Sequence, residues 1–246
     1  MKSYIKLPEI KDLPDSSIKK RQITDNIWKN YIIFIILKYY KDINKKEVCL
    51  LIQKEIEKDN SQIEKILKQH IYNWYKQIKK SDKQIGIWGF ILNLEPSSEG
   101  FEGFYDFKFQ HSDWNKYFVF EAKNLGKIKS TEYSTSINEY VYVKTENRED
   151  GGMFRFIINK YARDIDFGGM LGFVVGNTTG DVIKRLTERI KFIYKNSNEG
   201  KLTGKEIIFN SIENNTNTFD TIHLRKNHFT QLEEEFRLHH IIMDFT

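Results

Sequence analysis

The chain has 246 residues and a mass of 29.4 kDa, which is enough to bury one large hydrophobic core. Its hydrophobic content of 39% and aromatic content of 14% exclude an intrinsically disordered protein. The 39 basic and 34 acidic residues leave a formal net charge of +5, which permits an anionic partner without requiring one.

The first 60 residues predict an N-terminal arm followed by a helical extension. Residues 1–22 are polar and typical of a loose lead-in to a fold. Helices are predicted over 25–40 and 45–58, although the β-branched run at 32–36 is also typical of a strand. We assign no chemistry to this part of the chain.

Three features of the first 60 residues indicate the cellular compartment of the protein. The most hydrophobic run, Tyr31–Leu37, is far shorter than the roughly 20 residues that span a bilayer. No apolar segment at the start precedes a small-residue cleavage site, so we expect no secretory signal. The single cysteine, Cys49, lies in an apolar run and is typical of a core residue in a reducing compartment. We therefore expect a cytoplasmic protein without membrane contact.

Residues 61–176 predict a core in the order helix, three strands, helix, strand. Ser61 and Glu64 form a capping box, and apolar residues recur at helical spacing from Ile63 to Ile78. The period then changes to that of strands separated by turn-rich segments, which predicts an antiparallel meander. The predicted strands cover 85–96, 103–109 and 116–125, a loop covers 126–136, and a helix and a strand cover 152–161 and 168–176.

Residues 177–246 predict an amphipathic helix at 178–196 and strands at 205–212, 219–224 and 236–245. No internal repeat or linker divides the chain. We therefore predict one α/β domain spanning 1–246, in which 1–60 form the extension, 61–176 the core, and 177–246 complete the fold.

Two acids and a lysine lie at the ends of neighbouring predicted strands. Side chains alternate across a strand, so Glu121 and Lys123 share one face at the end of an apolar strand. Asp106 lies in the preceding strand, and one hairpin brings the two carboxylates together. Because a buried charge is costly unless it is compensated, this pattern favours a site for Mg²⁺ or Mn²⁺. A lysine beside such an ion suits phosphate chemistry.

The triplet by itself is not specific, because a chain with 30% charged residues produces Glu-x-Lys by chance. Glu9 and Lys11 form a further match in loop-like sequence. Taken alone, the triplet is more typical of an exposed strand edge or of an ion pair. Its position after an apolar strand, with an acid in the partner strand, separates it from the other matches.

Asp106 followed by Glu121-Ala122-Lys123, in this order of elements, resembles the PD-(D/E)xK nuclease superfamily, the restriction-endonuclease-like fold. The resemblance covers about 61–176 and implies a three-layer α/β/α sandwich with a mixed central sheet. It implies that Asp106 and Glu121 bind a divalent metal and that Lys123 is the catalytic lysine. Tyr105 stands where many members carry proline, which departs from the motif.

The resemblance also implies roles outside the triplet. Many members place an acid on the first core helix, for which Glu64 is the candidate metal ligand, with its capping role as the alternative. Arg155 or Lys160, on the helix after the third strand, would help to contact the scissile phosphate, with a role as ordinary solvated helix charges as the alternative. The loop residues Lys127 and Lys129 have a composition suited to contacts with a nucleic-acid backbone.

The histidines near the end of the chain offer an alternative site. His223, His228, His239 and His240 lie in the last 24 residues, which makes a zinc site conceivable. Adjacent His239 and His240 would, however, face opposite sides of a strand, so one ion could not easily collect all four.

The resemblance implies a Mg²⁺- or Mn²⁺-dependent endonuclease that hydrolyses DNA rather than RNA, with a role in phage defence or restriction. A partner protein of a defence system and a homodimer both stay open. The alternative is a catalytically inactive subunit that keeps the nuclease fold and serves for nucleic-acid binding or assembly.

Overall fold

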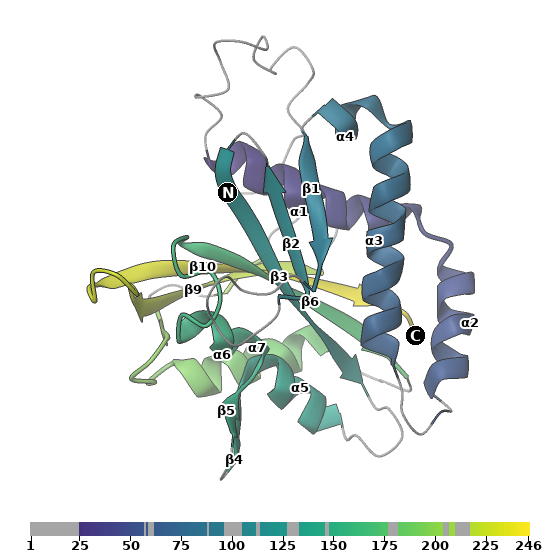
Figure 1. Ribbon diagram of the computed structural model, residues 1–246. Coiled ribbons are helices and arrows are strands. Elements are labelled where there is room, and N and C mark those ends of the chain that lie inside the picture. The colour runs from purple at the N-terminus through teal and green to yellow at the C-terminus, as the bar shows by residue number, and fades with distance from the viewer. Residues whose placement is uncertain are drawn as a thin grey trace.

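A computed structural model describes residues 25–56, 58, 62–87, 89–95, 105–111, 114–126, 133–145, 148–176, 182–203, 207–209 and 217–246. The chain is mixed α/β (Figure 1). The helices are α1 (Asp25–Asp42), α2 (Lys45–Ile56), α3 (Ile63–Ser81), α4 (Lys83–Ile87), α5 (Tyr133–Val141), α6 (Gly152–Ile157) and α7 (Val182–Tyr194). The strands are β1 (Phe90–Leu94), β2 (Phe107–His111), β3 (Trp114–Gly126), β4 (Val143–Thr145), β5 (Arg148–Asp150), β6 (Phe167–Val175), β7 (Lys201–Leu202), β8 (Ile208–Phe209), β9 (Thr218–Lys226) and β10 (Glu233–Asp244).

One mixed sheet organises the described residues. Its strand order is β1-β2-β3-β6-β10-β9-β7, and β8 pairs with β9. The first three strands form the predicted antiparallel meander. The strands β3 and β6 are parallel, as are β6 and β10, because the chain crosses over between them. The small hairpin β4-β5 forms a separate two-stranded sheet within the first crossover.

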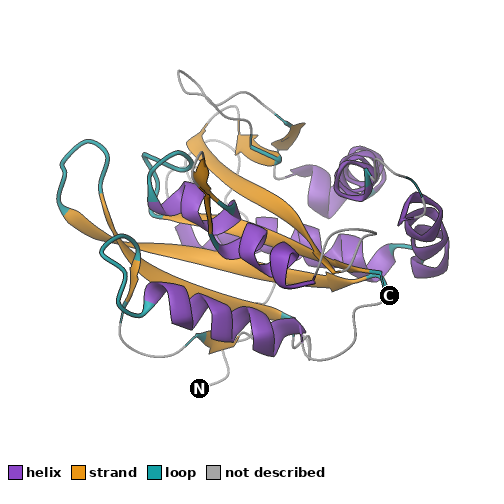
Figure 2. Cartoon of the chain, turned by 90° about the horizontal axis from the view of Figure 1, so that it is seen from below, coloured by secondary structure: helices purple, strands orange, loops and turns teal. Residues whose placement is uncertain are grey.

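Helices cover both faces of the sheet, as Figure 2 shows. On one face the side chains of α1 and α3, such as Trp28 and Tyr75, pack against Phe90, Phe109 and other aromatic residues of β1–β3. On the other face α5, α6 and α7 bury a second apolar cluster against β3, β6, β9 and β10. This arrangement is compatible with the predicted α/β/α sandwich.

Within the N-terminal extension, α1 covers 32–36, so the strand alternative for this run is wrong. The predicted arm, 1–22, lies outside the described residues. In α1 the buried residues Trp28, Ile32, Ile36 and Tyr39 recur at helical spacing against the sheet. The β-branched residues therefore reflect burial within the helix. Of the helices in the described part of the chain, none has the length and apolarity to cross a membrane.

Two predictions of local structure are wrong. Residues 83–87 form α4 where a strand was expected to begin at 85, because Asp82 accepts hydrogen bonds from the backbone N–H groups of Ile85 and Gly86. The predicted loop 126–136 includes the start of α5. Its hydroxyl residues look loop-like in sequence, but Ser136 is buried and its hydroxyl oxygen accepts the N–H of Gly126.

The helix α5 lies in the crossover that the sequence assigned to 152–161 alone. Its residues Ile137, Tyr140 and Val141 are buried against β3 and α7 at helical spacing. The second helix of this crossover, α6, is short and ends at Ile157. Both α5 and α6 follow β3 in the chain and contact it, so they lie close to the strand that carries Glu121 and Lys123.

Candidate active site

The alternation predicted for β3 is present in the structure. Val119 and Leu125 belong to the apolar cluster under α5, whereas Phe118 and Phe120 pack on the opposite face with α1. Glu121 follows the first set, and its side chain is only 1% exposed. The strand therefore carries a carboxylate into the interior.

Asp106 lies next to this carboxylate. It directly precedes β2, whose first residue Phe107 pairs with Phe120 of β3. Its Oδ2 accepts a hydrogen bond of 2.6 Å from the backbone N–H of Ala122. The hairpin therefore brings Asp106 to the middle residue of the Glu121-Ala122-Lys123 triplet.

Lys123, the last residue of the triplet, pairs with two carboxylates. Its Nζ lies 2.8 Å from Glu121 Oε1 and 3.7 Å from Glu64 Oε1. Burial alone would favour the neutral amine, but Glu121 and Glu64 raise the pKa of Lys123 above its ordinary value. These carboxylates favour the ammonium form of Lys123, which can donate hydrogen bonds and stabilise negative charge.

Arg155 of α6 holds Glu121 from the other side. Its guanidinium donates to Glu121 Oε1 at 2.6 Å, to both oxygens of Asp150 at 2.7 and 3.0 Å, and to the hydroxyl of Tyr161 at 3.0 Å. The forked pairing with Asp150 fixes the orientation of the guanidinium plane. Arg155, which the resemblance placed at the scissile phosphate, thus also has a structural role at the buried carboxylate.

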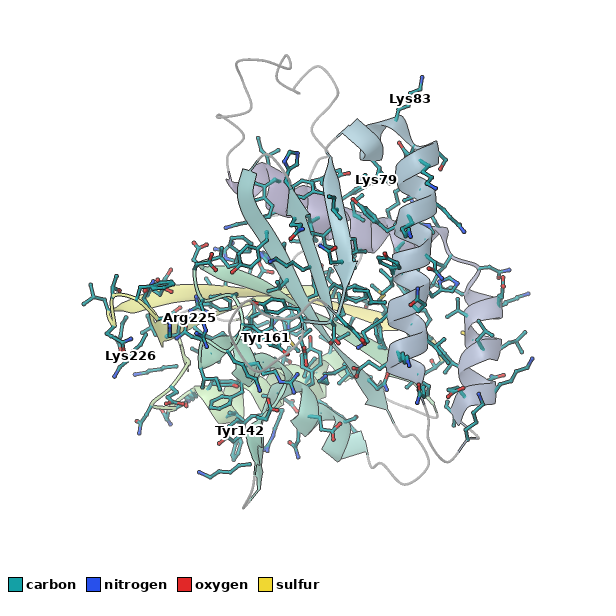
Figure 3. The ribbon with its side chains drawn as sticks, in the orientation of Figure 1. Lys79, Lys83, Tyr142, Tyr161, Arg225 and Lys226 are labelled. Atoms are coloured by element: carbon teal, nitrogen blue, oxygen red, sulfur yellow. The ribbon has the colours of Figure 1, made fainter. Side chains whose placement is uncertain are left out.

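A glycine allows α6 to approach β3 closely. A Cβ at Gly152 would lie 2.6 Å from Met170 Cε, 2.9 Å from the carbonyl oxygen of Tyr140 and 3.4 Å from Lys123 Cγ. A larger residue would push α6, and Arg155 with it, away from the triplet. Figure 3 shows Tyr161, the hydroxyl partner of Arg155, in the centre of the molecule beside the sheet.

Lys68 of α3 is a residue that the sequence analysis missed. Its Nζ lies 2.5 Å from Asp106 Oδ1, 2.9 Å from Glu95 Oε1 and 3.7 Å from Glu64 Oε1. Glu64 thus faces Lys68 and Lys123. The N-cap of α3 is Gln62, without a side-chain cap, while Ser61 lies outside the described residues. The predicted capping box is not seen, and Glu64 belongs to the charged cluster.

Acids outnumber bases in this cluster, and one carboxylate oxygen has no partner. Glu121 Oε2 is buried without a hydrogen-bond partner among the described residues. Burial raises the pKa of Glu121 to about 7, against the effect of Lys123, and the charge of Asp106 adds to the rise. The cluster comprises five carboxylates and three cations: Glu64, Glu95, Asp106, Glu121 and Asp150 with Lys68, Lys123 and Arg155.

This chemistry suits a divalent cation. With all five carboxylates ionised, a doubly charged ion would offset the two excess negative charges and give Glu121 Oε2 a partner. Within the described ranges, no three His, Cys, Asp or Glu side chains are arranged to hold a metal. The residues that would hold an ion here are Asp106 and Glu121, and Mg²⁺ is commonly bound through one or two protein carboxylates.

Of the other residues predicted to contact nucleic acid, Lys160 is half-buried and has no described contact with the triplet. Its charge contributes to lowering the pKa of Asp150, after the larger contributions of Arg155 and Gly151. Lys127 and Lys129 lie outside the described residues.

Two of the histidines near the chain end, His223 and His240, belong to a separate buried network. The carbonyl of Gly200 accepts from His223 Nδ1 at 2.8 Å, so His223 Nε2 accepts from the hydroxyl of Thr221 at 2.9 Å. Thr221 in turn accepts from His240 Nε2 at 3.0 Å, and the hydroxyl of Tyr140 donates to His240 Nδ1 at 3.0 Å. All four ring nitrogens are engaged, which leaves none for a zinc ion.

The two neighbouring histidines do face opposite sides of β10, as predicted. His240 stacks on Phe219, with ring centroids 4.4 Å apart, on the face that α5 covers. His239 instead pairs with Asp220 Oδ1 at 2.8 Å on the other face. The four histidines therefore do not converge on one point.

The buried network predicts a loss of stability in acid. Burial lowers the pKa of His223 to about 4 and that of His240 to about 3, whereas the unfolded chain protonates near 6.5. Their contribution is present above pH 6.5 and is lost as the pH falls toward 4. We expect the pair to remove about 4 kcal/mol of unfolding free energy between pH 7 and pH 5.

Guanidinium unfolding at both pH values measures this loss. The variant His240→Gln is expected to lose about half of the pH dependence, roughly 2 kcal/mol. The matched control His228→Gln, at the exposed β9–β10 turn, should keep all of it. A pH dependence in His240→Gln equal to that of the wild type would contradict the assignment.

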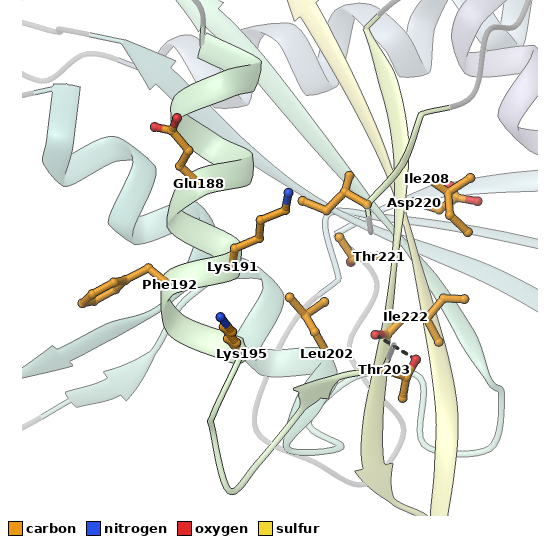
Figure 4. A pocket seen from close by; sticks show the side chains of 11 residues that line it. Glu188, Lys191, Phe192, Lys195, Leu202, Thr203, Ile208, Asp220, Thr221 and Ile222 are labelled. Atoms are coloured by element: carbon orange, nitrogen blue, oxygen red, sulfur yellow. Dashed lines mark hydrogen bonds between the residues drawn. The ribbon is translucent and has the colours of Figure 1, made fainter. Parts of the chain in front are cut away.

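A cavity of about 500 Å³ lies away from the charged cluster, between α7 and the strands β7–β9 (Figure 4). Leu202, Ile207 and Ile222 give it an apolar lining, and Lys191 of α7 lies at its side. Phe192 is turned outward and is 77% exposed. The triplet of β3 does not line this cavity, so the cavity has no bearing on the chemistry of the charged cluster.

Comparison with protein-family models, with curated proteins and with solved structures finds no match for this chain.

Proposed function

We propose that this protein is a divalent-metal-dependent endonuclease of the PD-(D/E)xK type, acting on DNA. The observation that supports this most is the meeting of Asp106, Glu121 and Lys123 at one end of the β2-β3 hairpin, with Glu121 Oε2 buried and unpartnered. With α4, the hairpin β4-β5 and α6 set aside, the order α3, β1, β2, β3, α5, β6, in which β3 and β6 are parallel, is compatible with the αβββαβ core that the resemblance implies.

Each residue of the site has a task in phosphodiester hydrolysis. Asp106 and Glu121 would hold a Mg²⁺ or Mn²⁺ ion, which supplies Lewis-acid chemistry and lowers the pKa of bound water when present. Water adds across the phosphodiester, so a bond from its oxygen to phosphorus forms and the bond to the leaving oxygen breaks. Lys123 is the buried ammonium that stabilises the charge on the phosphoryl oxygens in the transition state.

Two further contacts preorganise the carboxylates. The N–H of Ala122 fixes Asp106 Oδ2, and Arg155 fixes Glu121 Oε1 while Asp150 orients the guanidinium. Because these groups are held before substrate arrives, little reorganisation is needed during the reaction. A role in phage defence or restriction remains part of this proposal by resemblance alone.

A cleavage assay tests the proposal. Purified protein is incubated with supercoiled plasmid, linear duplex, single-stranded DNA and RNA, in Mg²⁺, in Mn²⁺ and in EDTA. We expect metal-dependent cleavage of DNA that EDTA abolishes. Salt-sensitive binding of nucleic acid with no cleavage in either metal would instead support the alternative, a nuclease-fold binding or assembly subunit.

A further inference from the structure

The cavity between α7 and the strands β7–β9 has the size and lining of a small-molecule site (Figure 4). Its volume of about 500 Å³ falls within the range of about 300–1,000 Å³ that such sites occupy. Leu202, Ile207 and Ile222 give it an apolar lining. Leu202 and Ile222 are only half-buried, so an apolar ligand here would remove further apolar surface from water.

The pairing of the edge strands explains why the cavity forms at this place. The strand β7 pairs with β9 at His223 and Leu224, whereas β8 pairs with β9 at Phe219 and Asp220. The two short strands therefore cover different parts of β9. Ile222 lies between these two pairings and lines the cavity.

Buried hydrogen bonds fix both walls of the cavity. The carbonyl oxygen of Gly200, directly before β7, accepts from His223 Nδ1 of β9 at 2.8 Å. At the end of α7 the hydroxyl of Tyr194 donates to the carbonyl oxygen of Val141 at 3.1 Å. The walls are therefore held in place without a ligand, which lowers the cost of ordering them on binding.

Two lysines give the α7 wall of the cavity a positive charge. Lys191 and Lys195 lie one helical turn apart, and both line the cavity. Figure 4 shows Lys191 directed from α7 toward the strands. Neither lysine forms an ion pair with another described residue. An anionic group at the cavity would therefore find two uncompensated ammonium groups.

The two acids that line the cavity do not neutralise these lysines. Asp220 already pairs with His239 Nδ1 at 2.8 Å and with Arg237 at 4.0 Å. Glu188 points away from the strands in Figure 4. The apolar lining and the paired lysines thus favour a ligand that is apolar over most of its length and negatively charged at one end.

We propose that this cavity binds an amphipathic organic anion of the fatty-acid type. Its carboxylate would pair with Lys191 and Lys195, and its chain would fill the space lined by Leu202, Ile207 and Ile222. The volume of the cavity fits a free small molecule. This inference is independent of the proposed nuclease activity, because the triplet of β3 does not line the cavity.

A displacement experiment on the full chain tests the proposal. The probe is anilinonaphthalene sulfonate, an aromatic anion whose fluorescence rises in apolar surroundings. We expect one probe to bind per chain and dodecanoate, below its micelle concentration, to displace it. Dodecyltrimethylammonium has a chain of the same length with a positive charge, and it should bind about tenfold less tightly or worse. Acetate, which lacks the chain, should displace nothing.

Charge reversal at the cavity wall tests the role of the lysines. The variant Lys191→Glu/Lys195→Glu changes two exposed positions and is expected to weaken dodecanoate binding about tenfold or more. The matched control is Lys76→Glu/Lys80→Glu, which makes the same change at two exposed lysines one turn apart on α3. It should bind dodecanoate as wild type does. Leu202→Trp, which places an indole ring in the cavity, should abolish binding.

Weaker binding in both cavity variants, with the control unchanged, supports the proposal. Equal dodecanoate affinity in wild type and in Lys191→Glu/Lys195→Glu overturns it, and so does a wild-type protein that binds neither dodecanoate nor the probe. Binding to anionic phospholipid vesicles without binding of free dodecanoate also overturns it, because the partner would then be a membrane surface. The charge reversal decides the question even if circular dichroism shows that Leu202→Trp fails to fold.

Discussion

Replacement of Glu121 by glutamine is expected to lower the rate of metal-dependent DNA cleavage by about a thousandfold or more. The amide keeps the shape of the side chain but cannot offer a charged oxygen to a divalent ion. Loss of a charged metal ligand removes several kcal/mol of stabilisation from the transition state, and each 1.4 kcal/mol corresponds to about a tenfold change in rate. The measurement is the single-turnover cleavage rate of a defined duplex in Mg²⁺ and in Mn²⁺.

A matched control separates this effect from loss of the fold. Glu47→Gln makes the same chemical change on α2, where the side chain is exposed and outside the charged cluster. It should cleave at the wild-type rate. If Glu121→Gln retained wild-type cleavage while folding normally, the assignment of Glu121 as a metal ligand would be wrong.

Lys123→Met is expected to lower the cleavage rate by about a hundredfold to a thousandfold while Mn²⁺ binding is kept or strengthened. Loss of one preorganised donor to the transition state has an effect of this size in other hydrolases. Metal affinity should not fall, because Lys123 pairs with Glu121 Oε1 at 2.8 Å and so competes with a cation for that carboxylate. Of the two readouts, only the cleavage rate is therefore expected to fall.

The control for this variant is Lys65→Met on the exposed side of α3, close to the cluster in sequence but without a part in it. It should change neither cleavage nor binding. A parallel loss of cleavage and of Mn²⁺ binding in Lys123→Met would indicate that the ammonium maintains the structure of the site, and the catalytic role would be withdrawn.

The face on which Glu121 lies and the position of Asp106 could be predicted from the sequence, because both follow from the periodicity of strands. Alternation along β3 predicted that Glu121 and Phe120 point to opposite faces of the sheet. A short turn predicted that Asp106 lies beside the triplet. Both inferences depend only on local geometry, namely the period of 2 and the closure of a hairpin. The same kind of signal predicted α1, α3 and α7 from their buried faces.

Other parts of the site depend on contacts between distant segments. Lys68 and Asp106 are 38 positions apart, and Arg155 and Glu121 are 34 apart. No local period indicates such pairs. One signal was present for Lys68: it occupies the apolar face of α3 three and seven residues before the buried Ile71 and Tyr75. A charge in that position indicates a buried partner.

The helix α5 was missed for a different reason. Its first residues carry hydroxyl groups, which favour loops and helix ends in short peptides. Tertiary packing of Ile137, Tyr140 and Val141 against β3 and α7 outweighs this preference. Whether a crossover segment of this kind forms a helix therefore depends on its packing against the sheet that it covers.

The charged cluster explains why its acids can be buried at all. Lys68, Lys123 and Arg155 each pair with at least one carboxylate. Under the proposed function, a site built in this way is held in place before any ion binds, and the unpartnered Glu121 Oε2 would attract one.

Crystals of the protein grown with Mn²⁺ give the most direct test of the central claim, through anomalous scattering at the manganese edge. The account predicts a peak within about 2.5 Å of carboxylate oxygens of both Asp106 and Glu121, at the end of β3 beside Lys123. A peak bound by other residues alone, or no peak at saturating Mn²⁺, would contradict it.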